Sequence, residues 1–211
     1  MSTAARLALD RNPHHSSRER ILAAAAELFA AYGYENTSTL SITRAAGTSE
    51  TQLMKHFRNK EGLLEAIFAE LVAKMLKFLN DVSHLPSPRE RLREFFRMAV
   101  AWLEQHPDQK ILFLLDLRRV RSKHTGEVLA GICARDFVTQ IDELLKEATA
   151  AGELKCGIKV SLLRSVIFGA VSELLRDAML SHDYASRASS DQIDNMVTYI
   201  FSIVFESASV V

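Results

Sequence analysis

The sequence has no apolar run that approaches the roughly 20 residues needed to cross a bilayer, and residues 1–13 are polar and charged. These absences predict a cytoplasmic protein without a signal peptide or a membrane helix. Cysteine is scarce as well, since Cys133 and Cys156 are the two present and they stand far apart without metal-ligand spacing. This use of cysteine is typical of reduced thiols in a reducing compartment, so no metal site is expected.

The sequence also lacks the motifs that would identify an enzyme. It contains no phosphate-binding glycine loop, no GxSxG turn, no HExxH and no paired cysteine ligands. No reaction can therefore be named, and neither a cofactor nor a catalytic residue is predicted. Because an active site can be assembled from distant residues, an all-α enzyme or a small-molecule-binding protein without a regulatory role remains the alternative interpretation.

The sequence also has no net excess of positive or negative charge, because 26 basic residues balance 26 acidic ones over 211 positions. The balance is uneven along the chain, since residues 1–60 carry eight lysines and arginines against five acids. A mildly basic head is typical of a phosphate-facing domain attached to one that is not. A protein that coats DNA without sequence preference should be much more basic than this chain.

What the sequence does have is helical periodicity, and with 48% hydrophobic residues it can bury a substantial core. No stretch shows a strand pattern stronger than this helical periodicity, so we expect an all-α fold with about nine helices. Ser16, with Glu19 three residues later, predicts a capping box for the first helix. The expected helices span residues 16–32, 40–46, 50–57, 60–82, 88–106, 107–120, 126–151, 160–180 and 191–207.

The stretch from Ser38 to Phe57 holds two short helix-sized runs joined by a glycine and a serine. Gly47 can take the positive φ that ends the first helix, and Ser49 can cap the second, with Gln52 completing a capping box. Apolar residues recur at spacings of four, so each helix has one apolar face and the two faces can pack at an angle. They are Ile42, Ala46, Leu53 and Phe57. This layout predicts a helix-turn-helix.

The second of these helices would leave polar side chains pointing outward, and they are candidate DNA contacts. Lys55 and His56 are the expected phosphate contacts, joined by Lys60 at the next helix start and by Ser38 and Thr39 at the preceding one. His56 has a second interpretation as a packing residue beside its apolar neighbour.

Thr51 and Gln52 are the expected base readers, because glutamine can bond adenine through two hydrogen bonds. A capping box would instead occupy the Gln52 side chain. Glu50 would repel phosphate unless it accepts a bond from a cytosine amino group or serves the positive end of its own helix. Of these two roles for Glu50, the helix-end role is favoured.

A longer pattern runs in register and without gaps from Ser16 to Phe68. It consists of Arg20-Ile21-Leu22-x-Ala24-Ala25-x-x-Leu28-Phe29, Gly33-Tyr34, Thr37-Ser38, Ile42, Ala45-Ala46-Gly47-x-Ser49, Leu53, His56-Phe57 and Lys60-Glu61-x-Leu63-Leu64. In these residues the N-terminal portion closely resembles the TetR family of transcriptional regulators. Beyond them the resemblance is one of helix count and length.

Residues 1–15 show no periodicity and include Asn12-Pro13, which predicts a flexible arm. The resemblance implies a three-helix DNA-binding domain over 16–62, and an effector-binding and dimerisation domain over 63–211. It adds Thr48, Ser49 and Met54 to the DNA-contacting set, although the family usually has an aliphatic residue in place of Thr48 and often an aromatic one in place of Met54. The implied function is a sequence-specific transcriptional repressor that a small effector releases from a palindromic double-stranded DNA operator.

The last two helices carry wide apolar faces, more than one contact with the body of the protein should require. A four-helix interface between two chains would bury the excess, and the resemblance implies that these helices form a homodimer in this way. The candidate interface residues are Leu163, Ile167, Val171, Leu174, Ile193, Val197, Ile200 and Val204. A two-fold axis would present two reading helices to half-sites about 34 Å apart.

The middle helices contain bulky apolar residues that suit a pocket for an apolar or amphipathic effector. Plain core packing is the alternative, and the family resemblance favours the pocket. Candidate lining residues are Met75, Phe78, Leu79, Met98, Trp102, Phe113, Leu117, Arg118, Phe137 and Ile141, with Gln140 or His106 as further polar groups. The helix over 60–82 would act as the lever, and a tenfold loss of operator affinity needs about 1.4 kcal/mol of coupling.

Overall fold

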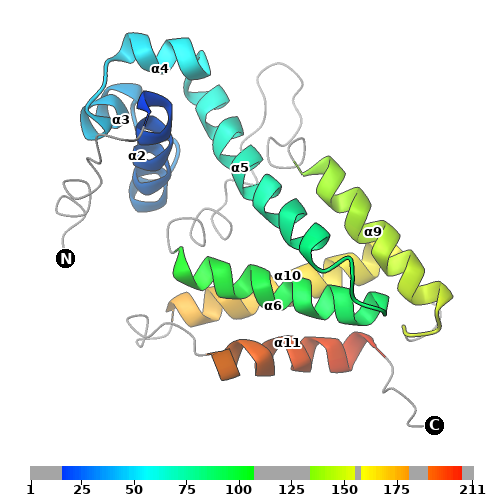
Figure 1. The fold of residues 1–211 in the computed structure, drawn as a ribbon. Helices are drawn as coiled ribbons and strands as arrows, with labels where there is room; N and C mark the ends of the chain where they lie inside the picture. The colour runs from blue at the N-terminus through cyan, green and yellow to red at the C-terminus, as the bar shows by residue number, and fades with distance from the viewer. Residues whose placement is uncertain (1–15, 107–133, 155–157, 181–189, 206–211) are drawn as a thin grey trace. The chain divides into compact units, whose positions relative to one another are not determined.

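The computed structural model describes residues 16–106, 134–154, 158–180 and 190–205, which form eight helices in two compact units (Figure 1). The helices are α2 (Ser17–Tyr32), α3 (Thr39–Ala46), α4 (Glu50–Phe57), α5 (Lys60–Asp81), α6 (Pro88–Gln105), α9 (Arg135–Ala150), α10 (Val160–Leu180) and α11 (Ser190–Val204). Within the described ranges the only β-type pairing is an isolated bridge between Leu154 and Phe205, so the prediction of an all-α fold is confirmed there.

The observed helix bounds follow the sequence pattern closely in most places. The predicted helices over 50–57 and 160–180 have the predicted ends, and those over 40–46, 60–82 and 88–106 differ by one residue at one end. The helix predicted from residue 126 is different, because α9 begins at Arg135 after a turn at Ala134. The helix predicted over 107–120 lies outside the described residues.

The start of α2 has the capping box that the sequence predicts. The backbone N–H of Glu19 donates to Ser16 Oγ at 3.3 Å, and Glu19 Oε2 accepts from the backbone N–H of Ser16 at 2.8 Å. At the other end Gly33 has a φ of 81° and donates its N–H to the Phe29 carbonyl at 2.9 Å. Both ends of α2 therefore have partners for their otherwise unsatisfied backbone groups.

The first unit has one hydrophobic core to which α2, α3, α4 and α5 all contribute. Ile21, Phe29, Ile42 and Leu53 are completely buried in it. The α5 residues of this core are Leu63, Leu64, Ile67 and Phe68. The unit accordingly extends to Leu71, so the domain boundary expected after residue 62 falls inside its packed core.

The joint between α4 and α5 is closed by backbone geometry that the sequence pattern does not reveal. Arg58 ends α4 with a φ of 66°, a conformation that L-residues rarely adopt. Asn59 then caps α5, since its Oδ1 accepts from the backbone N–H of Gly62 at 2.7 Å. A Cβ on Gly62 would lie 2.2 Å from the Phe57 carbonyl oxygen, so the chain passes itself too closely for any side chain there.

The second unit contains the end of α5, from Val72, and a bundle of four further helices. Helix α6 packs against α9 and α11, and α10 packs against the same two helices (Figure 1). Phenylalanines fill the space between them, with ring centres 5.0 Å apart for Phe95 and Phe96, 5.7 Å for Phe95 and Phe137, and 5.2 Å for Phe96 and Phe168. The tilted and edge-to-face angles of these rings are favourable for aromatic packing.

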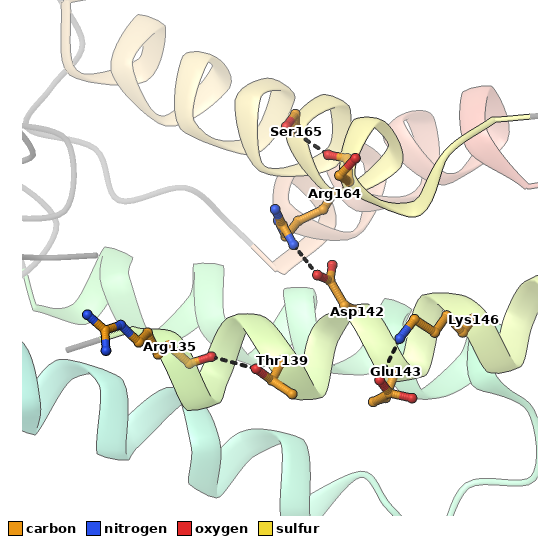
Figure 2. A network of polar contacts seen from close by, with 8 residues as sticks. Arg135, Thr139, Asp142, Glu143, Lys146, Arg164 and Ser165 are labelled. Carbon is orange, nitrogen blue, oxygen red and sulfur yellow. Dashed lines mark hydrogen bonds and ion pairs between the residues drawn. The ribbon is translucent and has the colours of Figure 1, made fainter. Parts of the chain in front are cut away.

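Helices α9 and α10 are also joined by an ion pair, which Figure 2 shows together with its neighbours. Arg164 of α10 donates to Asp142 of α9, and both side chains are 26% exposed. Asp142 Oδ1 is buried without a partner in the described part of the chain. Arg164 therefore supplies the charge that makes burial of this carboxylate tolerable, because a buried charge without its partner is strongly destabilising.

Replacing Gly62 with alanine tests the close approach at the α4–α5 joint. Because the added Cβ meets a backbone oxygen that cannot rotate away, we expect Gly62→Ala to lower the free energy of unfolding by about 1–3 kcal/mol. Urea or thermal unfolding measures the change. Ala69→Ser, at an exposed position of the same helix, is the control and should stay within about 0.5 kcal/mol of the parent. Equal stability of Gly62→Ala and the parent would contradict the geometry.

Candidate nucleic-acid interface

Helix α4 presents one buried and one exposed face, as the sequence pattern predicts. Leu53 and Phe57 are 0% and 5% exposed and belong to the core of the first unit. The remaining side chains of the helix are all exposed: Glu50, Thr51, Gln52, Met54, Lys55 and His56. An eight-residue helix that is anchored by its apolar face and polar on the other has the layout of a reading helix.

The turn before α4 fixes the angle between α3 and α4. Gly47 is in the left-handed conformation, with φ 61° and ψ 42°, and its N–H is directed at the carbonyls of Thr43 and Arg44. Ser49 caps α4 by accepting from the backbone N–H of Gln52 at 3.3 Å. The return bond from the Gln52 side chain, which the sequence suggested, is not formed among the described residues. Gln52 is thus left exposed at the surface of α4.

The starts of α3 and α4 are linked by a side-chain hydrogen bond. Thr39 Oγ1 donates to Glu50 Oε1 at 2.8 Å, and each is the first residue of its helix. Ser38 caps α3, with its Oγ accepting from the backbone N–H of Ser41 at 3.0 Å. Two of the residues predicted to contact DNA therefore contact each other.

His56 is bonded to the start of α2. Its Nε2 lies 2.9 Å from Ser17 Oγ, and its ring centre lies 6.0 Å from that of Phe57. The side chain thus combines exposure at the surface of α4 with a structural contact across 39 residues of sequence. No local signal could have identified Ser17 as its partner, because folding alone brings the two residues together.

The two candidate lysines differ in their surroundings. Lys55 is exposed, and its ammonium group has no partner in the described part of the chain. Lys60 is half-buried, with Nζ 4.1 Å from the centre of the Tyr34 ring. Burial, followed by the charges of Glu61, Glu35 and Glu65, raises the pKa of Tyr34 to about 12, so this ring is neutral at physiological pH.

Thr48 differs from the other predicted DNA contacts. Its side-chain oxygen is buried and has no hydrogen-bond partner among the described residues, while its backbone N–H donates to the Thr43 carbonyl at 2.9 Å. The residue as a whole is partly exposed, so the assignment of Thr48 to the interface stays a prediction.

A hollow of about 300 Å³ lies beside the end of α4, within the first unit. Its charged and polar lining is mixed in sign and includes Arg18, His56, Arg58, Glu61 and Glu65. Arg18, which the sequence pattern did not single out, donates to Glu70 at 3.1 Å and lies 5.5 Å from the centre of the Phe57 ring. Opposite charges already offset each other here, so the lining is not a simple anion site.

In the second unit, the described candidates for effector binding are buried or half-buried. Met75, Phe78, Leu79, Phe137 and Ile141 are at most 8% exposed, and Met98 and Trp102 are intermediate. Phe137 packs in the aromatic core of the bundle, whereas Gln140 and His106 are exposed. Phe113, Leu117 and Arg118 lie outside the described residues, so an effector pocket remains a prediction.

Most of the residues predicted to form the dimer interface are covered within a single chain. At most 6% of each of these side chains is exposed: Leu163, Ile167, Val171, Ile193, Val197 and Ile200. They pack in the bundle's own core, so their part in an interface with a second copy stays a prediction. Leu174 is 38% exposed and remains a candidate, and nothing is described of the Val204 side chain.

Other large apolar side chains are exposed on these two helices. Leu162 and Val166 of α10 are 56% and 43% exposed, and Tyr199 of α11 is 67% exposed.

Among the described helices, none is both long and apolar enough to cross a membrane. Nor do the described ranges bring together three or more histidine, cysteine, aspartate or glutamate side chains suited to hold a metal ion.

Two family models match the chain. Residues 21–67 match the model described as bacterial regulatory proteins of the tetR family, and residues 85–176 match a tetracyclin repressor-like C-terminal domain. Among curated proteins, the fatty acid metabolism regulator protein of Bacillus subtilis is 28% identical over 159 residues, which are 73% of this chain and 79% of that protein.

Solved structures show the same fold. FadR from Bacillus subtilis, solved in complex with stearoyl-CoA, has a TM-score of 0.75 at 22% identity and covers 87% of this chain and 97% of its own. AibR, solved in complex with isovaleryl coenzyme A and operator DNA, has a TM-score of 0.71 at 23% identity, with coverage of 88% and 98%. With both its helix-turn-helix and its C-terminal helices matched, the chain belongs to the TetR family and is a DNA-binding transcriptional regulator.

Proposed function

We propose that this regulator is a repressor that binds a palindromic operator as a homodimer, with α4 of each copy in a major groove. The observation that supports this most directly is α4 itself, in which Leu53 and Phe57 are buried while five polar side chains and Met54 are exposed. A helix held in this way can enter a groove about 12 Å wide without losing its support. In this proposal the protein acts in the cytoplasm and catalyses no reaction.

The exposed residues of α4 divide into two roles. Lys55 contacts phosphate, because its ammonium group is exposed and uncommitted within the described structure. Thr51 and Gln52 read base edges, and the absence of a return bond to Ser49 leaves both groups of the Gln52 amide available. Ser38 and Lys60 add phosphate contacts from the neighbouring helix starts. His56 contributes from its position against Ser17.

Substitutions at Lys55 and Gln52 separate the two roles. We expect Lys55→Ala to weaken binding to all sequences alike and to reduce the slope of log affinity against log salt by about 2, because each of the two copies loses one phosphate contact. Gln52→Ala should instead change the preferred base at one position of each half-site. Binding measured over a salt series, together with selection from a random DNA pool, distinguishes these effects. Uniform losses from both variants would contradict the assignment.

Dimerisation is proposed to use the apolar side chains that single-chain packing leaves exposed on the last two helices. Leu162, Val166, Leu174 and Tyr199 are the large apolar residues exposed there among the side chains that the structure describes. Covering them with the same surface of a second copy removes them from water and generates a two-fold axis. That axis is what allows two α4 helices to read half-sites about 34 Å apart.

A charge at Val166 tests this surface. We expect Val166→Glu to convert the dimer to a monomer at micromolar concentration and to lower operator affinity at least tenfold, because a buried unpaired carboxylate opposes association. Sedimentation or light scattering measures the mass. Thr139→Glu, at an exposed position of α9, adds the same charge elsewhere and should leave the dimer intact. A stable dimer of Val166→Glu would place the interface elsewhere.

The effector is proposed to be an acyl thioester of coenzyme A. Two structurally similar proteins were solved with such thioesters, one with a stearoyl and one with an isovaleryl group. The apolar and aromatic interior of the second unit suits the acyl part, while coenzyme A supplies the polar part of an amphipathic molecule. Helix α5 contributes residues to both units and is the proposed route by which binding changes the spacing of the reading helices.

Operator binding in the presence of defined compounds tests the effector class. We expect stearoyl-CoA or isovaleryl-CoA to reduce operator affinity at least tenfold, which corresponds to about 1.4 kcal/mol of coupling. Free coenzyme A and stearate should act much more weakly, and octyl glucoside controls for a detergent effect. If neither thioester changed operator affinity, the proposed effector class would be contradicted, but the proposed DNA recognition would not.

A further inference from the structure

A carboxylate on the DNA-reading face of this protein calls for an explanation. Glu50 is exposed and opens α4, the helix that carries Thr51, Gln52 and Lys55. Close to a duplex its negative charge repels phosphate, so it lowers affinity for every sequence unless it gains a specific bond. The one base edge in the major groove that offers a carboxylate a good donor without an adjoining acceptor is the cytosine amino group.

The Glu50 side chain is held in place before DNA arrives. Thr39 Oγ1 donates to Glu50 Oε1 at 2.8 Å, from the first turn of α3 to the first turn of α4. The unsatisfied N–H groups at these two helix starts favour a negative charge there. The second oxygen, Oε2, has no partner in the described part of the chain and belongs to an exposed residue. One oxygen is thus fixed while the other is available.

We infer that Glu50 determines specificity by accepting a hydrogen bond from a cytosine amino group, and that Thr39 is the residue that positions it. This inference rests on the proposed function, because it needs α4 in the major groove. It changes the roles assigned from sequence: Glu50 is a base reader instead of a helix-end charge, and Thr39 acts through Glu50 instead of on phosphate.

The chemistry of the threonine hydroxyl supports this reassignment. The hydroxyl has one hydrogen, which in this structure is directed at Glu50, and a phosphate oxygen can only accept. Thr39 therefore cannot donate to both groups at once. Because Thr39 already holds the carboxylate in one rotamer, Glu50 loses less side-chain entropy when it contacts a base. This favours a directed hydrogen bond over a diffuse effect of its charge.

The test begins with selection of bound duplexes from a random DNA pool by the intact protein. We expect a consensus with one cytosine in each half-site whose replacement by thymine, which presents an acceptor in place of the amino group, weakens binding about tenfold or more. Replacement by 5-methylcytosine keeps the amino group and should preserve more of the affinity than thymine does. For Glu50→Ala the thymine penalty should fall below about twofold, while affinity for random DNA rises because a negative charge is removed.

Variants at Thr39 and a charge control complete the design. Thr39→Val should reduce the thymine penalty, and Thr39→Ser, which keeps the hydroxyl, should retain it. Glu35→Ala removes an exposed charge from the same unit and should leave the base preference unchanged. A consensus whose cytosine preference survives Glu50→Ala, or that contains no such cytosine, overturns the inference. Failure to obtain any palindromic consensus would instead count against the proposed function itself.

Discussion

The angle between α3 and α4 is the constraint on which the rest of this structure depends. It is set by three residues of the turn and its flanks: Gly47 in the left-handed conformation, Ser49 as the cap of α4, and Ile42, which is completely buried behind them. Only this angle brings the start of α3 next to the start of α4, where Thr39 meets Glu50. Backbone geometry and the core beneath it therefore place the polar surface that we propose faces DNA.

Much of the first unit could be predicted from sequence because its signals are local. Caps such as Ser16 and Ser49, a glycine at a helix end and apolar spacings of four each act within a few residues, and they fix where helices start, stop and face. The contacts that sequence could not supply are those between distant elements. Ser17 against His56 and Arg18 against Glu70 depend on how α2 packs in the folded unit, and the positive φ of Arg58 follows from closing the chain toward Gly62.

The second unit shows a different limit of sequence analysis. Periodicity identified apolar stripes on α10 and α11, but a stripe does not say whether the chain's own core or another copy covers it. The densest stripe, with Ile167 and Val197, is buried inside the bundle, and sparser residues such as Val166 and Tyr199 remain outside. In this bundle the strongest apolar periodicity belongs to the chain's own core.

Helix α5 supplies one continuous backbone to two hydrophobic cores, with Leu64 and Phe68 in the first and Phe78 and Leu79 buried beyond the division at Leu71. Fraying at either end of such a helix removes hydrogen-bonded turns that support the other half, because helix propagation is cooperative. We therefore expect the melting of one core to be coupled to that of the other. In the proposed effector response, a molecule that stabilises the second core would also favour well-formed α5 in the first, without a rigid-body movement.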